Sequence, residues 1–224
     1  MLLIFDCDGV LVDSEPLSCR IDAEILTACG VPYTAEDVAR EFTGVSVKDQ
    51  IARIEAERGI RLPADFTERL NRTLFQRFET DLKPIEGVRD AILSLPFPRC
   101  VASSSIPERI ALSLRVTGLS DLFDTIFSST QVARGKPAPD LFLHAAKQMN
   151  VRPEDCLVIE DSMAGVQAAL AAGMRVIGFA GGGHCGSDHA EKLRRAGAPV
   201  VINRMAELQS AVRAIPSASY PSPL

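Results

Sequence analysis

Four separate stretches of the sequence carry polar side chains of the types that act on phosphate esters. Asp6 and Asp8 stand near the N-terminus with one residue between them. The other stretches contain Ser103–Ser105, Lys136 and the pair Glu160–Asp161. Cleavage of a phosphate ester needs a nucleophile, a proton donor for the leaving oxygen, and positive charge beside the phosphoryl oxygens. Together these side chains offer all three.

The spacing of the first two carboxylates suits two different catalytic roles. In an extended strand Asp6 and Asp8 point to the same face, and a turn at Gly9 lets both sit above the end of a sheet. One carboxylate can then attack phosphorus while the other transfers the proton.

The remaining polar residues supply charge and hydrogen bonds. Asp161 and the two N-terminal aspartates form a hard, oxygen-rich ligand set that suits Mg²⁺. Such an ion lets an anionic carboxylate approach an anionic phosphate. Lys136 adds a point charge, and Ser103 adds a hydroxyl donor. Any one of these residues could instead cap a helix or lie in a solvated loop, but the four stretches together favour chemistry.

Short apolar runs accompany these residues and have the length of buried strands. The runs are Leu2–Phe5, Arg99–Ala102, Thr125–Phe127, Cys156–Ile159, Arg175–Gly178 and Pro199–Ile202. Amphipathic stretches of helical length lie between them, such as Pro139–Met149 and Met163–Ala172. This alternation predicts a doubly wound, mainly parallel, Rossmann-like α/β sheet. Ligands bind such sheets at the carboxyl ends of the strands, where the polar stretches fall.

A helical segment interrupts this rhythm after the first strand. Residues 15–83 contain helical patterns at Arg20–Cys29, Val47–Arg58 and Phe66–Phe78, with no convincing strand between them. Glycines punctuate the segment as turns. We therefore predict an α/β core of residues 1–14 and 84–215, a helical insert of residues 15–83, and a flexible Pro/Ser-rich tail of residues 216–224.

Composition narrows the class of protein further. The chain has 224 residues, of which 46% are hydrophobic and 24% charged, as expected of a soluble globular protein. A net charge of −5 argues against a general electrostatic grip on nucleic acid or anionic lipid. The sequence has no apolar run long enough to span a membrane, and its first polar residue comes too early for a signal peptide. Six scattered cysteines without a C-x-x-C pair indicate a reduced, cytoplasmic protein.

Four motifs resemble those of the haloacid dehalogenase-like superfamily, in the same order and over nearly the whole chain. They are F-D-C-D-G-V-L-V-D-S-E at Phe5–Glu15, V-A-S-S-S at Val101–Ser105, G-K-P-A-P-D at Gly135–Asp140 and I-E-D-S-M-A-G-V-Q-A-A-L-A-A-G at Ile159–Gly173. The insert has the position and length of that family's four-helix cap. The chain is thus similar to the phosphoglycolate phosphatase and β-phosphoglucomutase branch.

The resemblance implies a role for each carboxylate. Asp6 would form an aspartyl-phosphate, and Asp8 would protonate the leaving group and later activate water. The cofactor would be Mg²⁺, bound by the Asp6 carboxylate, the Asp8 backbone carbonyl and Asp161. Glu160 would lie beside the ion or act through a water molecule.

The resemblance also implies how phosphate and substrate are held. Ser103 and Lys136 would bind the phosphoryl oxygens, with help from the backbone N–H groups of Cys7 and Ser104. The partner would be a small phosphorylated metabolite, acted on by a monomer or a weak homodimer.

Candidate substrate contacts in the insert are Glu15, Gly44 and Lys48. Glu15 could equally serve to start a helix. The G-V-S loop at Gly44 and the stretch His144–Val151 are similar to bacterial 6-phosphogluconate phosphatases, which favours a sugar or sugar-acid phosphate.

Two alternative functions remain open. A β-phosphoglucomutase-like mutase would share the nucleophile. However, those relatives carry an arginine where this chain has Val47, and a histidine where it has Ser18. Hydrolysis is therefore the expected outcome. A non-catalytic α/β binding module is the second alternative, which filled catalytic positions disfavour. A dehalogenase would lack an aspartate at position 8.

Three further features have competing interpretations. Cys7 could be a nucleophile, but apolar packing is the preferred interpretation. Asp13 is expected to brace the segment that enters the insert. His184, Cys185 and His189 stand in G-G-G-H-C-G-S-D-H and could form a transition-metal site, but their spacing matches no strong zinc pattern. We therefore expect a loop at the mouth of the site.

Overall fold

The chain divides into two compact units in this computed structural model, which describes residues 1–42, 45 and 47–215. Met1–Asp13 and Lys83–Leu224 form one unit, called here the core unit, and Ser14–Leu82 form the other, called the cap unit. These bounds differ by one residue at each end from the expected insert. The expected flexible tail, 216–224, lies outside the described residues, as does Gly44.

The core unit contains a parallel sheet of six strands in the order β3-β2-β1-β4-β5-β6. The strands are β1 Leu2–Phe5, β2 Arg99–Ser103, β3 Ile126–Ser128, β4 Cys156–Glu160, β5 Arg175–Phe179 and β6 Val200–Ile202. Each predicted apolar run thus forms a strand. Ile4 pairs with Cys100 of β2 on one side and with Val158 of β4 on the other. The strand order reverses direction at β1 and β4, which is where such sheets bind ligands.

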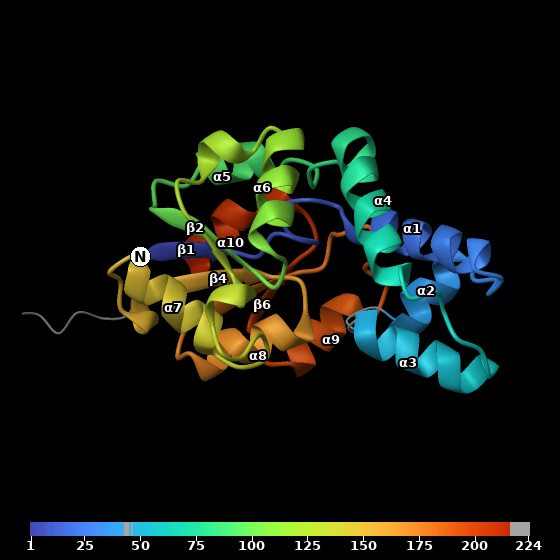
Figure 1. Ribbon diagram of the computed structural model, residues 1–224. Helices are drawn as coiled ribbons and strands as arrows, with labels where there is room; N and C mark the ends of the chain where they lie inside the picture. The colour runs from blue at the N-terminus through green and yellow to red at the C-terminus, as the bar shows by residue number, and fades with distance from the viewer. Residues whose placement is uncertain (43–44, 46, 216–224) are drawn as a thin grey trace, which may run out of the picture. The chain divides into compact units, whose positions relative to one another are not determined.

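Helices cover both faces of this sheet (Figure 1). They are α5 Val88–Leu93, α6 Pro107–Val116, α7 Asp140–Gln148, α8 Met163–Ala171, α9 His189–Arg195 and α10 Leu208–Ala214. Short 3-10 turns occur at Ser120–Leu122, Ser129–Gln131, Pro153–Asp155 and Met205–Glu207. Helices α7, α8 and α9 pack on the face to which Leu2 and Ile4 contribute.

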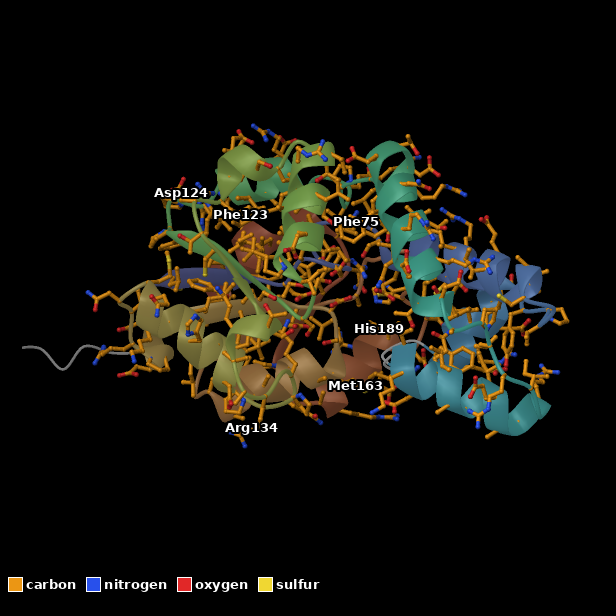
Figure 2. The ribbon with its side chains drawn as sticks, in the orientation of Figure 1. Phe75, Phe123, Asp124, Arg134, Met163 and His189 are labelled. Atoms are coloured by element: carbon orange, nitrogen blue, oxygen red, sulfur yellow. The ribbon has the colours of Figure 1, made fainter. Side chains whose placement is uncertain are left out.

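The central strand β1 is apolar throughout because both of its faces are buried. Leu2 and Ile4 enter the core under α7 and α8, and successive side chains alternate between faces. Phe5 instead meets Phe123, which is labelled in Figure 2, with ring centroids 5.8 Å apart in an edge-on arrangement. Full burial of side chains this large stabilises the fold by about 1.5–3 kcal/mol each. The carboxyl end of β1 is therefore a rigid support for Asp6.

The cap unit is a set of four helices with an apolar interior of its own. The helices are α1 Glu15–Ala28, α2 Ala35–Phe42, α3 Val47–Arg58 and α4 Phe66–Asp81. Buried Leu17, Ile21 and Leu26 line α1, and Phe66, Leu70 and Phe78 line α4. The first helix begins five residues earlier than the predicted Arg20, because Glu15 and Pro16 suit a first helical turn. No helix among the described residues of either unit is long and apolar enough to cross a membrane.

Candidate active site

Lys136 joins the carboxyl ends of three strands. Its Nζ donates to Asp6 Oδ1 at 2.6 Å, to Glu160 Oε1 at 2.5 Å and to the Ala102 carbonyl oxygen at 3.2 Å. The lysine side chain is only 5% exposed and also lies 5.0 Å from the centre of the Phe142 ring. Burial by itself lowers the pKa of Lys136, but Asp6 and Glu160 outweigh it and keep the pKa above its usual value. Lys136 is therefore a permanent positive charge beside Asp6.

Three buried carboxylates surround this ammonium group. Oxygens of Asp6, Glu160 and Asp161 all lie within 4.8 Å of one another. Burial raises the pKa of Asp6 well above its usual value, and Lys136 opposes this while the neighbouring carboxylates add to it. Burial also raises the pKa of Asp161. Three carboxylates face Lys136 and, beside Asp161, the His184 ring, so negative charge remains uncompensated, and a divalent cation with a preference for oxygen ligands fits such a site.

Glu160 is held by protein groups at both of its oxygens. Oε1 accepts from Lys136, and Oε2 accepts from both the N–H and the hydroxyl of Ser162 at 2.9 Å. Gly165 makes room for this carboxylate, because a Cβ there would lie 1.9 Å from Oε1. These contacts show that Glu160 also positions Lys136; its expected place beside the ion, directly or through a water molecule, stays a prediction.

The Asp8 carboxylate is held by groups from the segment that follows β2. Ser105 Oγ donates to Asp8 Oδ2 at 2.6 Å, and Arg109 Nη2 lies 3.0 Å from Asp8 Oδ1. Neither Ser105 nor Arg109 had been singled out in the sequence. The third hydroxyl of the serine run was a visible signal for Ser105. Arg109 lies in the first turn of α6, where only the folded chain shows its reach.

Gly9 allows the two N-terminal aspartates to share one edge of the sheet. Its backbone φ is +80°, which favours glycine. A Cβ on Gly9 would lie 1.9 Å from Asp161 Oδ2, so a side chain there would displace that carboxylate. Cys7, between the aspartates, is buried, and burial raises the pKa of its thiol well above the usual value. The structure therefore gives no support to Cys7 as a nucleophile.

The two serines expected to bind phosphate occupy different environments. Ser103 is buried at the end of β2, and its hydroxyl accepts from the Ser105 N–H at 3.1 Å. Ser104 is exposed, and its carbonyl accepts from the hydroxyl of Ser129 at 2.8 Å. Ser103 is the last residue of β2 and Ser104 follows it, and their contact with phosphate stays a prediction.

The glycine-rich loop after β5 contacts the carboxylate cluster directly. His184 Nε2 lies 3.1 Å from Asp161 Oδ2, and His189 Nε2 lies 2.6 Å from the Asp161 carbonyl oxygen. The Gly183 N–H donates to Asp13 Oδ1 at 2.8 Å, so Asp13 braces this loop. Burial lowers the pKa of His184, but hydrogen bonds with Asp161 and Cys185 outweigh it and raise the pKa to about 10.

The substrate contacts expected in the insert all belong to the cap unit. Glu15 is the first residue of α1, and Lys48 is exposed on α3. Gly44 lies outside the described residues. Their role toward a substrate stays a prediction.

Comparisons with known proteins agree with this fold. A sequence profile of haloacid dehalogenase-like hydrolases matches residues 3–179. The chain is 34% identical over 184 residues to the 6-phosphogluconate phosphatase of Escherichia coli, which covers 81% of this chain and 83% of that one. It is 35% identical over 179 residues to a phosphorylated carbohydrates phosphatase of Thermotoga maritima, with 78% and 82% covered.

A solved structure extends the likeness to three dimensions. It is a haloacid dehalogenase family hydrolase from Deinococcus radiodurans with bound phosphate and sodium. The TM-score is 0.80 at 35% identity, and 94% of each chain is covered. The chain belongs to the haloacid dehalogenase-like hydrolase family. Within that family it is a phosphatase, because the relatives that cover most of its length are named as phosphatases.

Proposed function

We propose that the chain is a Mg²⁺-dependent phosphomonoesterase that attacks a small sugar or sugar-acid phosphate with Asp6 and forms an aspartyl-phosphate. The observation that carries the proposal is the Asp6 carboxylate, fixed 2.6 Å from buried Lys136 at the switch point of the sheet. A nucleophile must be ionised and aimed. Lys136 favours the ionised form, and the rigid end of β1 aims it.

Proton transfer is assigned to Asp8. Its carboxylate lies two residues from the nucleophile and is oriented by Ser105 and Arg109. It can protonate the leaving oxygen and then take a proton from the water that attacks the aspartyl-phosphate. Contacts from two side chains fix one orientation of this group, which general acid–base catalysis requires.

The residues that would hold Mg²⁺ are Asp6 and Asp161, through their carboxylates, and Asp8, through its backbone carbonyl. When bound, the ion supplies positive charge that reduces repulsion between the carboxylate and the phosphate. Lys136 and the hydroxyl of Ser103 would bind phosphoryl oxygens, and Glu160 would hold Lys136 in place. The contacts of Lys136 with Asp6 and Glu160 support these assignments, and the other roles are those that the family resemblance implies.

The substrate class is proposed from the relatives. The E. coli relative is named for 6-phosphogluconate and the T. maritima relative for phosphorylated carbohydrates. Glu15, Gly44 and Lys48 of the cap unit are the proposed substrate contacts. Val47 offers no charge for a second phosphate, so hydrolysis is favoured over a mutase reaction.

We also propose that the protein is cytoplasmic and is a monomer or weak homodimer. The six scattered cysteines, which form no C-x-x-C pair, support a reducing compartment.

A panel of phosphate esters tests the proposal. Release of inorganic phosphate is measured for 6-phosphogluconate, several hexose phosphates, glycolate phosphate and p-nitrophenyl phosphate, with Mg²⁺ and with EDTA. We expect turnover of the sugar or sugar-acid esters that EDTA abolishes. Absence of turnover on every ester would contradict the enzymatic assignment. With β-glucose 1-phosphate and a bisphosphate primer, glucose 6-phosphate forming faster than inorganic phosphate would indicate a mutase.

A further inference from the structure

A second cluster of side chains of metal-ligand types lies between β5 and the first residue of α9. Ligand atoms of His184, Cys185 and His189 are all within 4.8 Å of one another. Cys185 Sγ is 3.5 Å from His184 Nε2, and the two imidazole rings are edge-on with centroids 5.4 Å apart. His189 also hydrogen-bonds with Cys185. The sulfur thus lies between two imidazole groups, of which His189 is labelled in Figure 2.

The hydrogen bonds leave a ring nitrogen of His189 available as a ligand. Its Nε2 lies 2.6 Å from the Asp161 carbonyl oxygen. A carbonyl oxygen can only accept, so Nε2 carries a proton, and in the neutral ring Nδ1 is the nitrogen that can bind a metal. A second nitrogen that donates to a backbone carbonyl is the usual support of a metal-binding histidine, because it fixes both the tautomer and the ring orientation.

The spacing of the cluster suits a tetrahedral ion. Zn–N bonds of about 2.0–2.1 Å and Zn–S bonds of about 2.3 Å place nitrogen and sulfur roughly 3.5 Å apart at the tetrahedral angle. The observed separation of Cys185 Sγ and His184 Nε2 is 3.5 Å. Two imidazoles and a thiolate suit Zn²⁺ or Co²⁺ and do not suit Mg²⁺, which prefers oxygen. The sequence left such a site open as an alternative, although the spacing of the three ligands matches no strong zinc pattern.

We propose that His184, Cys185 and His189 bind a zinc ion at a site separate from the carboxylate–lysine cluster, and that this ion inhibits the phosphatase. His184 Nε2 is the nitrogen that faces both Cys185 and Asp161 Oδ2. When Nε2 binds a metal, it has no proton to donate to Asp161. Asp161 then loses this partner or becomes the fourth ligand of the zinc ion. The inhibitory part of the inference rests on the proposed Mg²⁺-dependent function.

Cobalt binding tests the site without reference to activity. The full-length, metal-free protein is titrated with Co²⁺, and the sulfur-to-cobalt charge-transfer absorption is recorded. We expect one equivalent of Co²⁺ to produce the band, and Zn²⁺ to remove it. Cys185→Ser should abolish the band. Cys29→Ser, which changes a partly buried cysteine of the cap unit, should leave the band intact. Circular dichroism and thermal melting establish that both variants are folded.

His189→Gln separates metal binding from a general effect on the loop. Removal of one ligand should weaken Co²⁺ binding at least about tenfold, with the band reduced at equal metal concentration. No charge-transfer band in the wild-type protein, or an unchanged band in Cys185→Ser, would overturn the proposed site. An inactive protein that shows the band would instead contradict the phosphatase proposal and leave the zinc site standing.

Inhibition is measured next, relative to the Mg²⁺-dependent rate of each protein. Zn²⁺ should inhibit the wild-type protein and Cys29→Ser alike, and the concentration for half inhibition should rise at least about tenfold in Cys185→Ser. Equal sensitivity of all three proteins to Zn²⁺ would overturn the link between this site and Asp161.

Discussion

The core unit carries two groups of metal-binding side chains that are assembled in opposite ways. The carboxylate–lysine cluster contains Asp6, Lys136 and the adjacent pair Glu160 and Asp161, which come from separate segments of the chain. These segments meet because the carboxyl ends of parallel strands lie at one edge of the sheet. The loop cluster takes its three ligands from within His184–His189. The first is buried and rich in oxygen, whereas the second is partly exposed and contains nitrogen and sulfur. Asp161 contacts both clusters. The proposals therefore predict that Mg²⁺ at the first cluster activates the phosphatase and that Zn²⁺ at the second inhibits it.

The largest expected effect is at the nucleophile. Asp6→Asn keeps the size of the side chain but removes the attacking anion, so turnover should fall below about a hundredth of the wild-type rate. Asp124→Asn is the matched control, since Asp124 is exposed on the core unit (Figure 2). Phosphate release under saturating Mg²⁺ is the measurement. A variant that retains more than this fraction of the activity would contradict the role of Asp6 as the nucleophile.

The next effect is at the general acid and base. Asp8→Asn leaves the backbone carbonyl in place, so the Mg²⁺ affinity should change little, while kcat should fall at least about 10²-fold. A Mg²⁺ titration of activity gives both quantities. If Mg²⁺ binding collapses while kcat at saturating metal is nearly normal, Asp8 is a metal ligand through its carboxylate and not the proton donor.

Lys136→Met tests the charge balance of the carboxylate–lysine cluster through stability. The change leaves Asp6 and Glu160 without their buried ammonium partner, and breaking a buried ion pair in this way costs about 3–5 kcal/mol. Denaturant unfolding of the metal-free protein at pH 7 measures the cost. Arg134→Met, which loses an exposed pair with Asp140, should cost much less, because solvent screens surface ion pairs. An equal loss of unfolding free energy in the two variants would show that the buried ion pairs of Lys136 stabilise the fold no more than an exposed pair does.

A pH-dependent effect should separate the metal-free protein from the Mg²⁺-bound one. Burial raises the pKa of Asp6 and Asp161 above 3.8 in the folded state, so folding favours their protonated forms. Their contribution to stability is full below pH 3.8 and is lost as pH rises through the folded-state values. The melting temperature gained with Mg²⁺ should therefore increase from pH 5 to pH 8. A gain that shrinks over this range would contradict uncompensated charge at the site.

The smallest effect is expected at Arg109, which holds Asp8. Arg109→Gln removes one charged contact, while Ser105 keeps the other. We expect kcat to fall about tenfold, the size of one hydrogen bond to a charged group. The pH profile of kcat should also shift, which a merely structural role would not cause. Arg109→Lys should recover part of both.

The sequence predicted the positions of the strands better than the contacts at their ends. The continuous apolar run Leu2–Phe5 predicts a strand buried on both faces, and such a strand belongs in the centre of a parallel sheet, where the structure has it. The contacts of Asp8 with Ser105 and Arg109 depend on the path of a loop, which residue types do not determine. The apolar periodicity placed the start of α1 at Arg20, because Glu15 and Pro16 carry no such periodicity, whereas the alternative of a helix start at Glu15 agrees with the structure.

The loop cluster also shows that sequence alone does not determine side-chain contacts, even for residues that are close together in the chain. The spacing of His184, Cys185 and His189 matches no common zinc pattern, so the letters alone argued against a metal site. A turn closes here with a hydrogen bond from the Cys185 N–H to the Gly182 carbonyl oxygen at 2.9 Å. Gly182 leaves room for the His184 ring, since a Cβ there would lie 2.8 Å from it. Tight backbone geometry of this kind is visible only in the folded chain.

Chemical trapping of the phosphorylated enzyme tests the central claim most directly. Protein turning over its best ester is quenched rapidly in acid and reduced with borohydride, which converts an aspartyl-phosphate to homoserine. Peptide mass spectrometry should then find homoserine at position 6, only with substrate present and at no other carboxylate. An active enzyme whose Asp6 is never reduced, or whose homoserine appears at Asp8 or Asp161, would contradict covalent catalysis by Asp6.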